Sequence, residues 1–326
     1  MLVKESRKGF KRLSEPGACR LLVLITFALC SISTQAGSVH LLVSGKQPYY
    51  REAQHVFITT LLGLAPETTI SVTVLGDNPE QHTQHPSWSE DVLVTIGTPA
   101  TKLVHQHHAS QKTIALFITS DVWREISADH SYPDFHSAIA LDQSPDRIML
   151  LARLLAPHAR KAATVTGEIS STRTDALQES ATRLNFSLAS QALGTKDNPV
   201  ARMSPLFKNN DIFVALPDRA VFNRATAKWI LYLGFRSKVP VIGFSKAYTD
   251  AGALASIYAS PGNIGRHGAE LTARTLLDPD SFVSRLHSPR YYTLHSNSSV
   301  ARALDIDLPN ESTLYDMYEE ALARLP

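Results

Sequence analysis

Residues 238–277 read "KVPVIGFSKAYTDAGALASIYASPGNIGRHGAELTARTLL". Two apolar runs in it, "VPVIGF" (239–244) and "ALASIYA" (253–259), have the length and composition of β-strands. The glycine triplet that follows, Gly262, Gly265 and Gly268, lacks the spacing of a dinucleotide-binding loop and is not led into directly by a strand. It indicates instead the start of a helix that packs closely against a neighbour. The stretch therefore predicts strands alternating with helices.

The same alternation extends over the rest of the chain from residue 38. Amphipathic segments of ten to fifteen residues separate most of the short apolar runs, which is the pattern of parallel sheets with crossover helices. Eight further runs are predicted as strands: "VHLLVS" (39–44), "TISVTVL" (69–75), "VLVTI" (92–96), "TIALFIT" (113–119), "SAIALD" (137–142), "AATVTG" (162–167), "NFSLASQ" (185–191) and "DIFVAL" (211–216).

Ten strands suit two sheets of about five each, and 326 residues are long enough for two domains. The break falls near Pro145, which opens a Leu-rich helix. We expect an α/β fold of two Rossmann-like lobes with parallel sheets, 37–141 and 142–260. The C-terminal segment is expected to return to both, with 262–285 completing the first lobe and 290–326 the second. No internal repeat is visible by eye.

The first 36 residues have the pattern of a secretory signal. A basic start and the apolar run "LLVLITFALC" (21–30) precede Thr34 and Ala36, which stand at the small-residue positions before a cut at Gly37. An uncleaved anchor and a lipoprotein modified at Cys30 are the alternatives, although Leu29 occupies a position where a small residue is preferred. The pattern predicts a periplasmic or secreted protein.

Removal of this segment changes the composition of the chain. Both cysteines, Cys19 and Cys30, lie inside it, so the remainder can form no disulfide. The segment carries six Lys/Arg and two Asp/Glu, so the net charge of +2 becomes −2 after cleavage. The basic isoelectric point is therefore no argument for nucleic-acid binding.

Polar and aromatic side chains follow several predicted strands. Ligands of open α/β sheets bind beyond the carboxyl ends of the strands. The candidates at these ends are Thr98, Ser120, Asp121, Asp142, Asp218, Phe244 and Ser245. Backbone N–H groups of the helix after Gly97 would suit an anion, with the Thr98 hydroxyl helping, while the alternative for Thr98 is a helix N-cap.

Three blocks carry a family resemblance: "VLVTIGTPATKLV" (92–104), the stretch 238–277 and "NSSVARALDIDLP" (297–309). They resemble ABC-transporter substrate-binding proteins of the tryptophan-binding type, over about residues 38–310. The resemblance implies a periplasmic binding protein type I-like fold, with two lobes joined by a hinge. It also implies a monomer without cofactor or enzymatic activity that closes over a small organic ligand, often an amino acid, and serves an ABC permease or another membrane receptor.

The family's pocket positions would fall on Thr98, Asp218, Asn223 and Ser245. The chain departs from the family pattern in "TSDVW" (119–123), where an Asp-Pro is common, and in "SGKQPYY" (44–50). The ligand is therefore left open, and a sensor or an outer-membrane uptake accessory remains the alternative to a transport protein.

Asp218, in "DIFVALPDRAVFNR" (211–224), has three interpretations. It is the cap of the following helix, a ligand contact for an amine or hydroxyl, or, least favoured, a catalytic carboxylate. Ser245 in "GFSKA" imitates a nucleophile elbow, with His267, His287 or His295 as a base. A hydrolase is disfavoured because a turn and a strand, rather than a helix, are expected after the serine.

The thirteen histidines raise the question of metal binding. His105 and His108 share a face of a predicted helix, and "HTQH" (82–85) is a second cluster. No cysteine or dense carboxylate group accompanies them, so a solvated surface is favoured and no metal site is predicted. Aromatic residues near the strand ends serve either as ligand walls or as packing: Tyr49, Tyr50, Trp123, Phe222, Phe244 and Tyr248.

Overall fold

The structure, a computed structural model, describes residues 37–76, 90–107, 111–128, 135–167, 170–194, 196–218, 221 and 224–325, with the Arg224 side chain excepted. Residues Gly37–Pro326 form one compact unit. The proposed secretory segment lies outside the described residues, and no described helix has both the length and the apolar character needed to cross a membrane.

The first sheet has the strand order β11-β5-β4-β3-β1-β2, and its pairings in the described residues are parallel. Its strands are β1 (Ser38–Val43), β2 (Thr69–Val74), β3 (Val92–Ile96), β4 (Lys112–Ile118), β5 (His136–Ala140) and β11 (Leu286–His287). The helices associated with this sheet are α2 (Pro48–Leu64), α3 (Thr98–Gln106), α4 (Ser120–Ser127) and α10 (Pro261–Leu277), followed by the short η3 (Pro279–Ser281).

The second sheet has the order β12-β10-β9-β8-β6-β7, and β12 runs antiparallel to β10. Its strands are β6 (Lys161–Thr166), β7 (Ser187–Ala192), β8 (Ile212–Val214), β9 (Val241–Gly243), β10 (Ala255–Tyr258) and β12 (Thr293–Ser296). The remaining helices are α5 (Pro145–Leu155), η2 (Ser170–Arg173), α6 (Thr174–Arg183), α7 (Pro199–Asn209), α8 (Arg224–Ser237), α9 (Lys246–Asp250), α11 (Ser298–Ala303) and α12 (Glu311–Ala323).

All ten predicted strands are present, and the predicted two-lobed α/β fold is confirmed. The prediction missed β11 and β12, which add an edge strand to each sheet. Both are short, so neither produces a recognisable apolar run. The lobe boundaries near residues 141, 260 and 285 stay a prediction.

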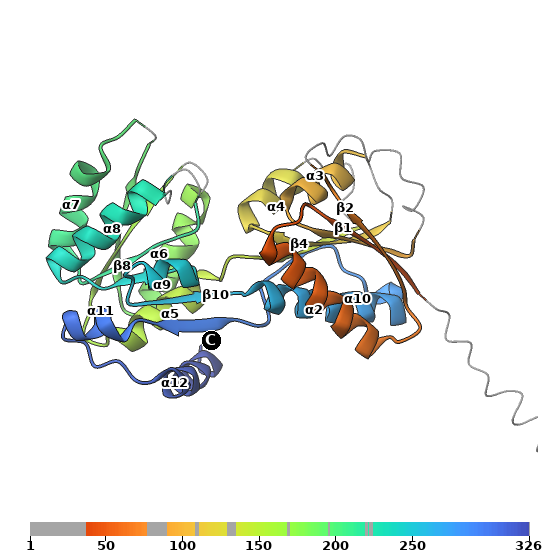
Figure 1. Ribbon diagram of the computed structural model, residues 1–326. Helices are drawn as coiled ribbons and strands as arrows, with labels where there is room; N and C mark the ends of the chain where they lie inside the picture. The colour runs from red at the N-terminus through yellow and green to blue at the C-terminus, as the bar shows by residue number, and fades with distance from the viewer. Residues whose placement is uncertain are drawn as a thin grey trace, which may run out of the picture. The chain divides into compact units, whose positions relative to one another are not determined.

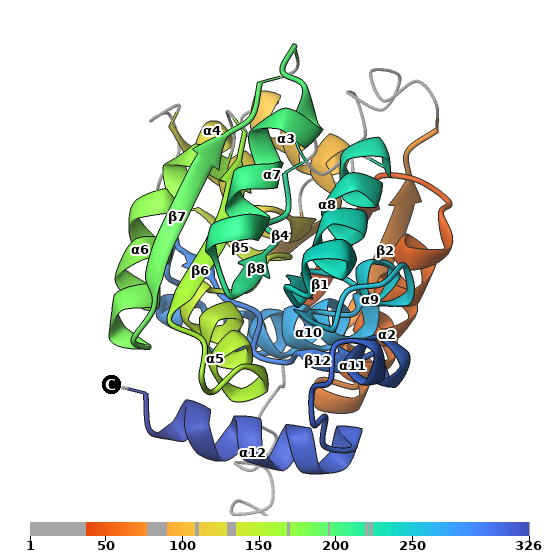
Figure 2. The same cartoon turned by 90° about the vertical axis from the view of Figure 1, so that its left-hand side faces the viewer.

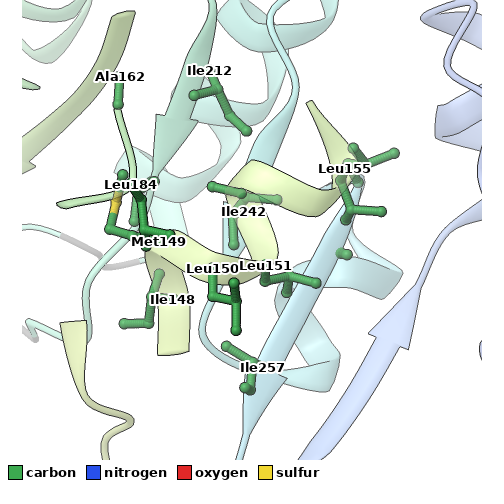
Figure 3. Packing of buried hydrophobic residues seen from close by; sticks show 14 of the residues in the cluster. Ile148, Met149, Leu150, Leu151, Leu155, Ala162, Leu184, Ile212, Ile242 and Ile257 are labelled. Atoms are coloured by element: carbon green, nitrogen blue, oxygen red, sulfur yellow. The ribbon is translucent and has the colours of Figure 1, made fainter. Parts of the chain in front are cut away.

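The core of the second lobe is built on α5. Ser144 caps this helix by accepting the Arg147 N–H, and Pro145 occupies the first turn, where its missing N–H costs nothing. Met149 and Leu151 of α5 are fully buried and belong to one cluster with Ile212, Ile242 and Ile257 of three neighbouring strands (Figure 3). A parallel sheet covered by helices on both faces needs such continuous apolar strands.

Helix α12 covers the other side of α5 (Figure 2). Tyr318 of α12 is fully buried, and its hydroxyl donates to the Arg147 carbonyl at 2.8 Å. Its ring lies 5.2 Å from that of Tyr292, edge to face. The C-terminal helix is therefore part of the core of this lobe rather than an appendage.

Helix α10 lies against α2 in the first lobe although the two are far apart in the sequence (Figure 1). A Cβ on Gly265 would stand 2.3 Å from the Ala53 carbonyl oxygen, and one on Gly268 would stand 2.5 Å from Leu116. The predicted close packing is confirmed for these two glycines. Gly262 has no such restriction, since a Cβ there would meet only ordinary contacts.

Candidate functional site

A cavity of about 590 Å³ is lined by residues that follow strands of both sheets. Such a volume is ordinary for a site that holds a small organic molecule. The lining groups from the ends of β3, β4 and β5 of the first sheet are Thr98, Phe117, Thr119, Leu141, Asp142 and Gln143, and those from β8, β9 and β10 of the second are Pro217, Asp218, Phe244, Ser245, Ile257, Tyr258 and Ala259.

The cavity brings together six of the nine predicted site residues: Thr98, Asp121, Asp142, Asp218, Phe244 and Ser245. Ser120 and Tyr248 do not line it. Ser120 donates its backbone N–H and its hydroxyl to Asp142, at 2.7 and 2.6 Å, and so positions that carboxylate. Asn223 lies outside the described residues.

Three aromatic rings form one wall of the cavity. Tyr49 of α2 stacks on Phe117 with ring centroids 5.5 Å apart and 8° between the planes, and Tyr50 meets both rings edge to face. Phe117 has a φ of 60° and stands at an irregularity in the pairing of β4 with β5. Such a bulge re-aims a side chain, and a left-handed aromatic residue is uncommon. The sequence gives no sign of this role of Phe117.

Phe244 is the aromatic contribution of the second sheet. Its ring lies 5.1 Å from Tyr248, which is buried. Burial raises the pKa of the Tyr248 phenol above its ordinary value. Tyr248 does not line the cavity and therefore packs against Phe244 from the protein interior. Trp123 is packing as well, since it is buried with Ile118 and Ile126, and Phe222 lies outside the described residues.

Two of the three cavity carboxylates share one buried arginine. Arg173 of η2 forms ion pairs with Asp121 at 2.8 Å and with Asp142 at 3.1 Å, and it also donates to the Pro217 carbonyl. Arg124 reinforces the group by binding Asp121 at 3.0 Å and the Thr172 hydroxyl at 2.8 Å. This network links α4 of the first lobe to η2 of the second. Arg173 was not among the predicted site residues, because it stands six residues beyond the predicted strand 162–167 rather than directly at its end.

Asp218 is buried in the loop that follows β8 and lines the cavity. Its carboxylate accepts the backbone N–H of Ser170 at 2.9 Å and that of Val221 at 3.4 Å. It is not the cap of α8, because Val221, three residues further on, is in a turn and not in a helix. The carboxylate instead orders the local turn and the start of η2, and this holds it at the cavity.

Thr98 is not an N-cap either, because Gly97 takes that position with a φ of 95°. Only glycine suits this position, since a Cβ would approach the hydroxyls of Ser44 and Tyr50 to 2.6 Å. The Ala100 N–H donates to Ser44, and Pro99 has no N–H. The expected anion site on free N–H groups is therefore largely occupied. Lys102, one turn into α3, is a positively charged residue that lines the cavity on the side of the first sheet, and it pairs with Glu125.

Ser245 is the N-cap of α9 and accepts the Tyr248 N–H at 3.3 Å. The expectation that no helix follows the serine was wrong, since α9 begins at the next residue. Ser245 nevertheless has a φ of −160°, which is extended backbone and not the strained turn of a nucleophile elbow. None of His267, His287 and His295 lines the cavity.

The other histidines do not form a metal centre in the described part of the chain. No group of three or more His, Cys, Asp or Glu side chains there could hold a metal ion. The His105 ring lies 6.0 Å from that of His136, edge to face. His108 and the "HTQH" cluster lie outside the described residues.

The two α/β lobes and a ligand-sized cavity at their strand ends are the architecture that periplasmic-type solute-binding proteins have. The model of the ABC transporter substrate binding protein family matches residues 82–314. The chain belongs to this family, which is extracytoplasmic and comprises proteins that bind small solutes for ABC transport rather than enzymes. The resemblance and the fold class predicted from the sequence are thereby confirmed.

Solved structures support the fold. A ligand-free, open substrate-binding protein with adhesive properties from Clostridium difficile is 16% identical, with a TM-score of 0.68 over 84% of this chain and 97% of that one. A domain from Streptococcus pneumoniae in complex with L-Trp is 14% identical, with a TM-score of 0.58 over 86% and 98%. A conserved domain protein from Vibrio cholerae is 18% identical, with a TM-score of 0.57 over 86% and 98%. No curated protein matches the sequence.

Proposed function

We propose that the protein captures a small amino-acid-like ligand with an apolar or aromatic body in the cavity between its lobes, for an ABC-type uptake system. The observation that carries the proposal is the distribution of chemistry in the cavity. Aromatic rings wall it on both sides, Thr98 and Lys102 lie on the side of the first sheet, and Asp218 and Ser245 lie on the side of the second.

These groups suit a zwitterion. A ligand carboxylate would accept bonds from the Thr98 hydroxyl and from Lys102, in place of the exposed Lys102–Glu125 pair. A ligand amine would donate to Asp218, since charge-assisted bonds are shorter and stronger than neutral ones. Asp121 and Asp142 are balanced by Arg173 and Arg124 together, so they shape the wall while their charge is compensated. The L-Trp bound to the Streptococcus pneumoniae domain is a ligand of this chemical type.

Closure of the lobes is the mechanism that we infer. A ligand that contacts both lobes stabilises the closed state only through contacts that the open state lacks. The aromatic wall of the first lobe and Asp218 of the second provide such contacts on opposite sides. Export by the segment 1–36, action as a monomer and delivery to an ABC permease belong to the same proposal.

A thermal-melt series tests the ligand chemistry. The probes are L-tryptophan, tryptamine, which lacks the carboxylate, and indole-3-propionate, which lacks the amine. A ligand present at 100 times its dissociation constant stabilises the folded protein by about 2.7 kcal/mol. We expect L-tryptophan to raise the melting temperature most. Equal shifts with all three probes would show that the charged ends are not recognised, and no shift with any of them would refute this ligand class.

A further inference from the structure

A second hollow, of about 390 Å³, lies along α10 and β11, and it shares no lining residue with the central cavity. Helix α10 contributes the lining side chains of one of its faces, because residues three and four apart lie on the same face of a helix. The polar lining groups are His267, Glu270, Arg274, Arg285, His287, Ser288 and Arg290.

Positive charge exceeds negative charge in this hollow. Its one described carboxylate, Glu270, is already engaged by Arg266 at 3.3 Å, Arg290 at 3.2 Å and the Tyr291 hydroxyl at 2.6 Å. Arg274 and Arg285 have no carboxylate within ion-pair distance among the described residues. Two guanidinium groups therefore face the hollow without a counter-charge.

The histidines add hydrogen-bond donors to the same space. The His267 Nδ1 accepts the Arg290 backbone N–H at 3.2 Å, so the proton of the neutral ring is on Nε2. The His287 ring lies 6.1 Å from that of His267. Burial, the neighbouring histidine and the arginines lower the pKa of His267 to about 4, as expected for a ring in a strongly positive surrounding.

We propose that this hollow binds the phosphate group of a small molecule or of a lipid headgroup. Guanidinium groups bind phosphate oxygens bidentately, and a neutral imidazole Nε2–H supplies a further donor. The volume exceeds 300 Å³, so it leaves room for the organic part of a phosphomonoester. Leu271 and Leu286 provide the apolar lining that such a part would contact.

Calorimetric titration of the protein with inorganic phosphate and with glycerol 3-phosphate tests the soluble ligands. Co-sedimentation with phosphatidylcholine vesicles, with and without phosphatidic acid, tests the lipid headgroup. We expect binding to at least one phosphate probe, and the responding probe identifies the source. Failure of all three phosphate probes would overturn the proposal.

Three variants decide whether this hollow is the site. Arg274→Gln with Arg285→Gln should weaken binding about tenfold or more, because two charge-assisted contacts are lost. Glu270→Gln should strengthen binding, since it removes the repelling charge while keeping the size of the side chain. Arg302→Gln, on α11 of the other lobe, is the control that removes a positive charge away from the hollow, and it should bind as the parent does. Undiminished binding by the double variant, or weaker binding by Glu270→Gln, would contradict the proposal.

Discussion

The two sheets have the same strand order but contribute different chemistry to the cavity. In each lobe the order along the sheet is last, fifth, fourth, third, first, second. The first lobe nevertheless contributes Tyr49, Tyr50 and Phe117, whereas the second contributes Phe244, Ser245 and Asp218. Burial of strands and crossover helices constrains topology, while residues after the strand ends are free to diverge. The repeat is therefore visible in the topology but not in the sequence.

The largest loss of stability is expected when the ion-pair network that links the two lobes is broken. Arg173→Met leaves Asp121 and Asp142 without their shared cation, and loss of one partner from a buried ion pair costs about 3–5 kcal/mol. Urea denaturation measures this loss. Arg183→Met is the control, because its ion pair with Asp146 is half exposed and such pairs contribute about 0–1 kcal/mol. Equal losses in the two variants would show that the link between the lobes is not a strong one.

The next largest loss of stability is expected when the close packing of α10 against α2, which is specific to the first lobe, is disturbed. Gly265→Ala should destabilise by about 1–3 kcal/mol, because the new methyl group would overlap the Ala53 carbonyl. Gly63→Ala on α2 is the matched control, with open space around the new Cβ, and should be neutral or stabilise by up to about 1 kcal/mol. Denaturant midpoints distinguish the two, and a tolerated Gly265→Ala would mean that α10 and α2 are not in close contact.

Within the second lobe, Ser245→Ala should cost about 1 kcal/mol, since it removes the N-cap of α9. The variant should keep the full ligand-induced rise in melting temperature if Ser245 acts mainly as a cap. A stability unchanged from the parent, together with lost ligand binding, would instead make Ser245 a direct ligand contact.

A separate, pH-dependent effect concerns acid stability at the α10 edge. The His267 pKa is about 4 when folded, against an ordinary 6.5, so the unfolded chain alone takes up a proton between these values. This lowers stability as the pH falls from 6.5 to about 4, with little further change below. His267→Asn should reduce that loss while leaving the remainder that comes from His287, whose pKa is also lowered. Urea titrations at pH 7 and pH 4.5 measure the difference, and an unchanged pH dependence would contradict it.

The fold could be predicted because parallel strands buried on both faces leave long apolar runs, as "VLVTI" shows for β3. Only part of the candidate site could be predicted from the sequence. Asp142 and Asp218 lie in the loops that follow β5 and β8, so their position in the chain indicates the cavity. The orientation of Phe117 toward the cavity depends on a bulge in β4, and the position of Arg173 depends on the placement of η2. Neither feature leaves a recognisable pattern in the local sequence.

The central claim is that one ligand contacts both lobes, and calorimetric titration with L-tryptophan tests it most directly. Tyr49→Ala removes a ring from the first lobe and Asp218→Asn a charge from the second, while Asp316→Asn on α12 is the charge-matched control. We expect each cavity variant to weaken binding about tenfold or more, because a stacked ring or a charged bond contributes about 1–3 kcal/mol. The control should bind as the parent does. Full affinity in either cavity variant would show that the ligand does not bridge the lobes as proposed.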